Sequence, residues 1–127
     1  MIAAYNGHLA ICRLLINKGA QLEAKYSDGW TPLHGAAFND RVEIVRLLCD
    51  SGADVEARTN DNSFRPGSRP LHYAAHSGHI SVVKELIEER NAEINARDED
   101  GRTALRVARD RNKPEIAAYL VSHGGIE

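Results

Sequence analysis

The chain has 127 residues and a formal net charge of −2 at pH 7, with 16 Lys and Arg residues against 18 Asp and Glu residues. This length allows one domain or one elongated array and excludes a large enzyme. Since no overall positive charge is available to attract phosphate groups, nucleic acid is not expected as a partner. Hydrophobic residues make up 43% of the chain and charged residues 27%, which is typical of a folded globular protein.

The sequence shows neither a membrane-spanning nor a secretion pattern. No apolar run reaches the roughly 18 residues needed to cross a bilayer, and the first residues lack the charged and apolar blocks of a signal peptide. We therefore expect no membrane partner and a location in the cytoplasm or the nucleus. Cys12 and Cys49 are too few for a disulfide framework and are interpreted as buried thiols in a reducing compartment.

The predicted helices fall into four pairs, at about 1–6 and 9–17, 32–39 and 42–50, 70–77 and 80–90, and 103–111 and 114–122. In the second pair, Thr31 is a suitable N-cap and Pro32 suits the first helical position. Residues 42–49 then place their apolar side chains along one stripe, as in a helix with one buried face. Gly52 follows as a left-handed C-terminal cap.

The sequence repeats itself with a period of 33 residues. One mark of the period is GAQLEA at 19–24, which returns as GADVEA at 52–57 and, after an expansion, as NAEINA at 91–96. A second mark is TPLHGAA at 31–37, which returns as RPLHYAA at 69–75. Helix pairs this short cannot bury their own apolar faces, so like units must stack into one continuous core.

This set of marks, TPLHxAA followed by GH, an LL-containing helix and GADV, resembles the ankyrin repeat over nearly the whole chain. The resemblance implies an all-α ankyrin-repeat solenoid of stacked helix-turn-helix units with β-hairpin-like turns. We predict a single ankyrin repeat domain over 1–127, with repeats at 1–25 (partial), 26–58, 59–97 and 98–127.

The third repeat is five residues longer than the period, and the excess falls at 62–68. In ankyrin repeats this turn projects as a finger, so the resemblance implies that Phe64 and Arg65 protrude from it. The alternative is a surface insertion without a role, because longer loops cost little entropy. Exposed loops also carry function disproportionately, which keeps both interpretations open.

The two ends of the array depart from the pattern in different ways. The first repeat begins inside its first helix, as in an excised fragment or a shortened N-terminal cap, so Ile2, Leu14 and Leu15 are expected at an open end. In the last repeat, Arg106 replaces the motif His and Arg109 the second Ala. Such a polar face is typical of a C-terminal capping repeat, although a basic face could also receive an acidic partner.

The best candidate for chemistry is the group His72, His76 and His79, whose spacing places three imidazoles near one helical face and could bind zinc or copper. The resemblance to ankyrin repeats implies that His72 and His79 form turn and inter-repeat hydrogen bonds. Of the three histidines, only His76 then has no role in the framework. Motifs of the types HExxH, GxGxxG and GxxxxGK do not occur in the sequence. We therefore predict no catalytic, cofactor-binding or metal-binding residues, and a chain that is not an enzyme.

Asn95 is a candidate modification site. Ile87 lies eight residues before Asn95, which follows Glu93 and Ile94, and this pattern resembles the ankyrin asparagine that the hypoxia-linked asparaginyl hydroxylase modifies. The alternative is a turn asparagine that hydrogen-bonds its own backbone.

The resemblance implies a non-catalytic module that binds a protein or peptide on the concave surface formed by the fingers and the first helices. Aromatic and Arg side chains are the usual anchors of protein interfaces. We predict that the partner-binding residues are Trp30, Phe38, Asn39, Phe64, Arg65, Tyr73, His76, Arg102, Asp110 and Arg111. We expect a monomer.

Two alternatives of a different class remain. The chain could be an adaptor or targeting segment of a larger enzyme or effector, such as a ubiquitin-ligase subunit or a pathogen effector, with the chemistry outside these residues. It could also be a scaffold that self-associates through the open first repeat.

Overall fold

The computed structural model describes residues 2–127. Its helices come in four pairs: α1 (Ile2–Tyr5) with α2 (Leu9–Asn17), α3 (Pro32–Phe38) with α4 (Val42–Asp50), α5 (Pro70–Ser77) with α6 (Ile80–Lys84) and η1 (Glu85–Glu89), and α7 (Ala104–Asp110) with α8 (Pro114–Ser122). Residues 2–127 contain no β-strand and no helix with the length and apolar character needed to span a bilayer. The predicted all-α fold is confirmed.

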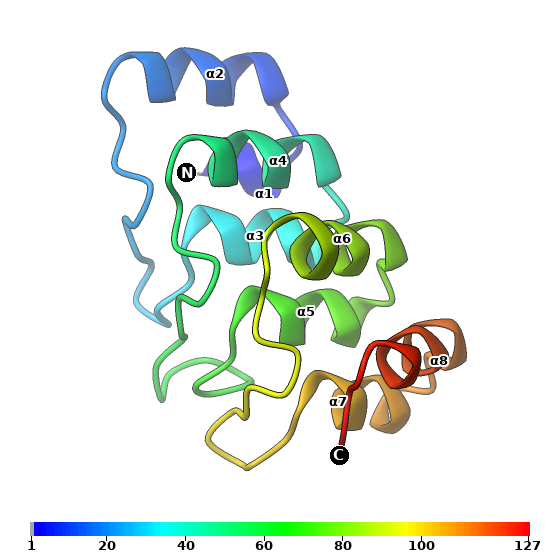
Figure 1. The fold of residues 1–127 in the computed structure, drawn as a ribbon. Coiled ribbons are helices and arrows are strands. Elements are labelled where there is room, and N and C mark those ends of the chain that lie inside the picture. The colour runs from blue at the N-terminus through cyan, green and yellow to red at the C-terminus, as the bar shows by residue number, and fades with distance from the viewer. Residues whose placement is uncertain (1) are drawn as a thin grey trace.

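The helix pairs stack in chain order. α1 packs against α3, α3 against α5 and α5 against α7, while α2, α4, α6 and α8 form a second row. Figure 1 shows the two rows, with the first and last pairs at opposite ends of the stack. The array is therefore a solenoid in which each pair contacts its neighbours and depends on them for a buried face.

The core lies between the rows and is built mainly from small and aliphatic side chains. Ala36, Ala37, Ala74 and Ala75 are fully buried, and their small size lets neighbouring first helices approach closely. Cys12 is buried as expected, whereas Cys49 is half-buried. Burial raises the pKa of the Cys49 thiol to about 11, so little of the reactive thiolate forms at neutral pH.

The motif histidines join one repeat to the next. The backbone N–H of Thr31 donates to His34 Nδ1 at 3.0 Å, so the proton lies on Nε2, which donates to the Ser68 carbonyl at 3.1 Å. His72 repeats the arrangement one unit later and donates to the carbonyls of Ala96 and Arg102. These bonds explain why the first helix of each inner repeat carries a buried imidazole.

A residue with a left-handed backbone follows each of α3, α5 and α7 within two residues. Gly78 has φ of 81°, while Asp40 and Asn112 occupy the matching positions with φ of 57° and 56°. Aspartate and asparagine tolerate this conformation better than other non-glycine residues, so the turn into the second helix is kept without glycine.

Helix bounds agree with the sequence predictions except in the third pair. The pattern predicts one helix over 80–90, whereas α6 ends at Lys84 and continues as the π-helical turn η1. This wider turn begins at the buried Glu85, which accepts hydrogen bonds from Arg46 at 2.8 Å and Arg90 at 2.9 Å.

The β-hairpin-like turns, here called fingers, connect successive pairs. The second finger (26–30) is closed by Tyr26 N–H donating to Trp30 O at 3.0 Å, and the fourth (98–102) by Asp98 N–H donating to Arg102 O at 2.9 Å. The third finger (59–68) is closed in the same way between Thr59 and Ser68. The five extra residues therefore form a longer tip without disturbing the stack.

Candidate functional site

Four of the residues predicted to bind a partner form one aromatic cluster: Trp30, Phe38, Phe64 and Tyr73. Trp30 ends the second finger, Phe38 ends α3, Phe64 lies in the third finger, and Tyr73 lies on α5. The Trp30 ring centroid is 4.7 Å from that of Tyr73 and 5.3 Å from that of Phe38, and Phe64 lies 5.5 Å from Tyr73. Residues far apart in the sequence thus share a single packed group of rings.

The exposure of these rings corrects part of the prediction. Phe64 is 61% exposed and Phe38 is half-buried, but Trp30 is only 8% exposed and Tyr73 is completely buried. Tyr73 cannot contact a partner, because the third finger covers it and its hydroxyl bonds to Ser63 Oγ and to the Arg65 carbonyl. Its role is to hold the third finger in place beneath Phe64.

Arg65 also differs from the expectation that it protrudes. The residue is 7% exposed, and its Nη2 donates to His76 Nδ1 at 3.2 Å while Nη1 lies 3.7 Å from Asp98 Oδ2. Arg65 therefore ties the third finger to α5 and to the fourth finger. The sequence pattern cannot predict this, because the two partners lie 11 and 33 residues further along the chain.

His76 packs beside the exposed part of the cluster, with ring centroids 5.9 Å from Phe38 and 5.5 Å from Phe64. Burial, together with the positive charges of Arg65, Arg111 and Lys113, lowers the pKa of His76 to about 4. The imidazole is consequently neutral at pH 7, consistent with its acceptance of a hydrogen bond from Arg65.

The remaining predicted residues differ in their availability. Arg102 is engaged with Asp98 at 3.1 Å and Asp100 at 2.7 Å, and Asp110 pairs with Arg106 at 2.9 Å. The Asn39 side chain donates to the Gly35 carbonyl at the end of α3. Arg111 is exposed beside His76, so the surface around Phe64 carries a positive edge.

The three histidines considered as a metal site do not converge. His72 bonds to the carbonyls described above, and His79 Nε2 donates to the Phe38 carbonyl at 2.8 Å. Within residues 2–127, no group of three or more His, Cys, Asp or Glu side chains is arranged to hold a metal ion.

The Asn95 side chain does not bond its own backbone, which is the alternative role predicted from the sequence. Its amide donates to the Gly124 carbonyl at 3.1 Å and its side-chain oxygen accepts from Ile126 N–H at 2.9 Å, so it binds the C-terminal tail rather than its own backbone. Hydroxylation of Asn95 remains a prediction.

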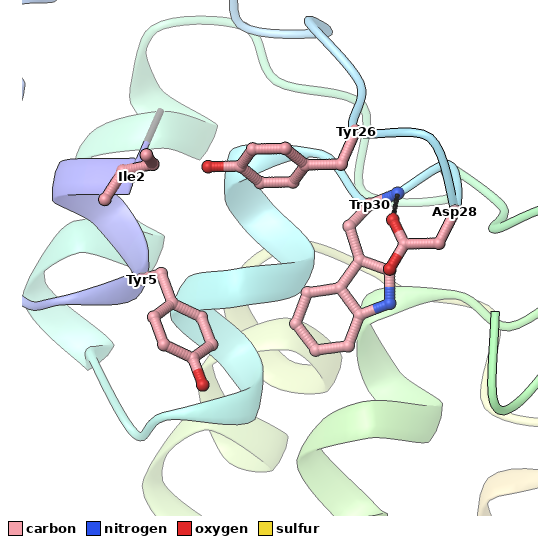
Figure 2. Close-up of a pocket in the computed structure, with 5 residues that line it drawn as sticks. All are labelled: Ile2, Tyr5, Tyr26, Asp28 and Trp30. Atoms are coloured by element: carbon pink, nitrogen blue, oxygen red, sulfur yellow. Dashed lines mark hydrogen bonds between the residues drawn. The ribbon is translucent and has the colours of Figure 1, made fainter.

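A pocket that the sequence analysis missed lies between α1 and the second finger (Figure 2). It has a volume of about 390 Å³ and is lined by Ile2, Tyr5, Tyr26, Asp28 and Trp30. Tyr5 occupies the register of Phe38 and His76 on its own first helix, so the repeat alignment could have identified it. Tyr26 and Asp28 belong to a turn whose local sequence carries no such signal.

Stacked helix pairs define a solenoid repeat protein. Here buried histidines join the pairs, and one row of helices and the fingers present side chains that differ from repeat to repeat. The chain belongs to the ankyrin-repeat family, because the family model "Ankyrin repeats (3 copies)" matches residues 1–59 and 56–127. Ankyrin repeats generally mediate interactions between proteins and are non-catalytic modules.

Individual relatives share this region and are longer than it. A transient receptor potential cation channel subfamily A member 1 homolog of Caenorhabditis elegans is 34% identical over 94% of this chain and 9% of its own length. Protein phosphatase 1 regulatory subunit 27 of Mus musculus is 43% identical over 46% of this chain and 37% of its own. Rabankyrin-5 of Mus musculus is 41% identical over 50% of this chain and 5% of its own. The chain thus corresponds to a minor part of each relative.

Proposed function

We propose that this chain is a non-catalytic module that binds a protein or peptide through the surface formed by its fingers and first helices. The exposure of Phe64 carries this proposal. Its large apolar side chain is 61% exposed, while the backbone on both sides of it is fixed by hydrogen bonds. Thr59 Oγ1 donates to the Arg65 carbonyl at 3.0 Å, and Arg65 N–H donates to Ser63 Oγ at 3.2 Å.

A fixed aromatic side chain is an efficient anchor for a partner. Aromatic side chains are enriched at protein interfaces, and a preformed loop loses little further entropy on binding. Phe38 and His76 support the Phe64 ring from below, so a partner side chain would meet a continuous apolar surface. Arg111 lies beside this surface and favours an acidic group next to the anchoring residue of the partner.

The experiment begins with peptides selected from a random displayed library against the wild-type chain. Phe64→Ala is then expected to weaken the selected peptides by about tenfold or more, as for a central interface aromatic. Val121→Ala, at another exposed apolar residue on α8, is the matched control and should leave binding unchanged. Equal peptide affinity in the wild type and Phe64→Ala would place the binding surface elsewhere.

A second candidate is an adaptor or targeting role within a larger protein. The small share of each relative that this chain matches favours it, as does the name of a phosphatase regulatory subunit among them. Chemical cross-linking in cells followed by mass spectrometry would test this candidate. Cross-links from the Phe64 surface to subunits of one enzyme complex would support it, and cross-links to unrelated single proteins would count against it.

A further inference from the structure

The pocket between α1 and the second finger brings together three aromatic rings and one carboxylate. The rings belong to Tyr5, Tyr26 and Trp30, and Asp28 is the one charged residue among the five that line the pocket. Figure 2 shows the tyrosine and tryptophan rings on different sides of a shared space, with the carboxylate of Asp28 next to the indole. This composition differs from the surface around Phe64, with which it shares Trp30 alone.

The aromatic walls are held by contacts outside the pocket. Trp30 is fixed by its packing on Phe38 and Tyr73, and Tyr5 lies 6.4 Å from it between ring centroids at an interplanar angle of 53°. Tyr5 packs on Gly35, where an added Cβ would come within 3.3 Å of Tyr5 Cβ, so the absence of a side chain at Gly35 makes room for it.

The finger itself positions the third ring and the charge. Tyr26 N–H donates to Trp30 O at 3.0 Å, and Gly29 N–H donates to Tyr26 O at 2.9 Å, which fixes the tight turn. Asp28 Oδ1 accepts from Trp30 N–H at 3.0 Å, which orients the carboxylate. Among the described residues, no Lys or Arg side chain forms an ion pair with Asp28, so its charge is available to a ligand.

Aromatic faces attract cations electrostatically, and methyl groups on the cation add apolar contact with the same faces. A methylated ammonium group suits such walls better than a bare ammonium does, because it is less strongly hydrated and needs no hydrogen-bond acceptor for each proton. We propose that this pocket binds a methylated ammonium group between Tyr5, Tyr26 and Trp30, with Asp28 supplying the opposite charge. The group could come from a methylated lysine of a protein or from a free quaternary amine.

Two matched probes separate cation recognition from simple apolar burial. Choline carries the trimethylammonium group, and 3,3-dimethylbutan-1-ol has the same shape without the charge. Trp30 is the one tryptophan in the chain, so its fluorescence reports on the pocket directly. We expect saturable quenching or shift of Trp30 emission by choline, with the neutral alcohol weaker by about tenfold because it lacks the cation–π and ionic attraction.

Variants test the roles of the carboxylate and of the ring. Asp28→Asn retains an oxygen for Trp30 N–H, and Tyr26→Leu retains apolar area, so each removes one kind of attraction. Both should reduce the preference for choline over the neutral alcohol several-fold, whereas Tyr119→Leu on α8 should not change it. This preference is a ratio within one variant, so modest changes in stability do not affect it, and far-UV circular dichroism verifies that each variant is folded.

A short peptide with trimethyllysine, and the same peptide with unmodified lysine, identify the source of the ligand. Tighter binding of the trimethyllysine peptide than of choline indicates a methylated protein, and equal binding indicates recognition of the free amine. The proposal is overturned if the neutral alcohol binds as tightly as choline, if Asp28→Asn keeps the full preference, or if no probe gives saturable binding. A loss of selected-peptide binding at Phe64 would not affect this outcome, because the pocket does not include Phe64.

Discussion

The two ends of the solenoid are built from the same kind of helix pair but differ in what covers them (Figure 1). The first pair leaves an apolar surface exposed, with large side chains at Ile2, Ile11, Leu14 and Leu15. The last pair presents charged residues, and residues of the C-terminal tail bond back to the stack. The expected open end and the expected polar face are both present in the structure, although Val121 and Ile126 remain exposed apolar residues at the second end.

The difference shows that a repeat unit gains its stability from its surroundings more than from its own sequence. α1 has four residues and α2 nine, which is too short for a stable isolated helix. α2 packs against α1 and α4, whereas α8 packs against α7 and α6 and is further held by the tail. We therefore expect the first pair to open locally at a lower free energy than the last pair.

The largest expected effect comes from a comparison of two truncations to alanine, one in the second helix at each end. Leu120 on α8 is fully buried, so Leu120→Ala should lower the free energy of unfolding by about 2–5 kcal/mol through lost burial and a residual cavity. Ile16 on α2 is only partly buried, so Ile16→Ala should cost less than half as much. Urea unfolding followed by circular dichroism measures both values.

The slope of the unfolding curve provides the control for this pair. Leu120→Ala should shift the midpoint without changing the slope, as for a residue of the cooperative core. If Ile16→Ala were as costly as Leu120→Ala, the first pair would be as strongly coupled to the stack as the last, and the proposed difference between the ends would be incorrect.

Acid should weaken the inner interfaces through their buried histidines. Burial lowers the pKa of His34 to about 4 from an ordinary value near 6.5, and it also lowers the pKa of His72. The unfolded chain therefore binds more protons than the folded chain below about pH 6.5, and stability falls as the pH falls toward 4. For His34 alone, the loss approaches about 3 kcal/mol at pH 4.

Unfolding curves between pH 7 and pH 4, with proton NMR of the imidazoles, measure this effect. The last repeat has Arg106 where the inner repeats have the motif histidine. Lowering the pH from 7 to 5 should therefore reduce the exchange protection of its backbone amides less than it reduces that of the amides of α3. His34 titrating near pH 6.5 in the folded protein would contradict the prediction. His8→Gln, at an exposed histidine outside the inner interfaces, is the matched control.

The sequence predicts the helix pairs and their stacking well, because the repeated motifs that specify them act over short stretches of the chain. Thr31 and His34 cap a helix within four residues, and the period places each unit on the next. Arg65 and Tyr73 could not be placed in this way, because their burial depends on contacts between the enlarged third finger, α5 and the fourth finger. An insertion can be located by counting, but the direction of its side chains depends on tertiary contacts.

The residues of the candidate sites differ in the same way: some can be predicted from the repeat, and others depend on tertiary contacts. Phe38 and His76 were predicted because they occupy repeat positions that the motif leaves unspecified, and Phe64 because it lies in the insertion of the third repeat. The three rings do pack together. Tyr5 lies in the same register and could have been included, whereas the approach of Tyr26 to it depends on how the second finger folds over α1. Register thus predicts which residues share a face, and turn geometry decides which of them enclose a pocket.

The smallest expected effect concerns the tail that distinguishes the last pair from the first. Asn95→Ala removes the bonds to the Gly124 carbonyl and the Ile126 N–H, both at the protein surface, and should lower stability by about 1 kcal/mol. Hydrogen exchange at the Ile126 amide and within α8 should become faster, bringing the last pair closer to the behaviour of the first. Asn17→Ala, at the exposed end of α2, is the matched control. Unchanged exchange at Ile126 in Asn95→Ala would mean that the two Asn95 bonds are not what holds the tail against the last pair.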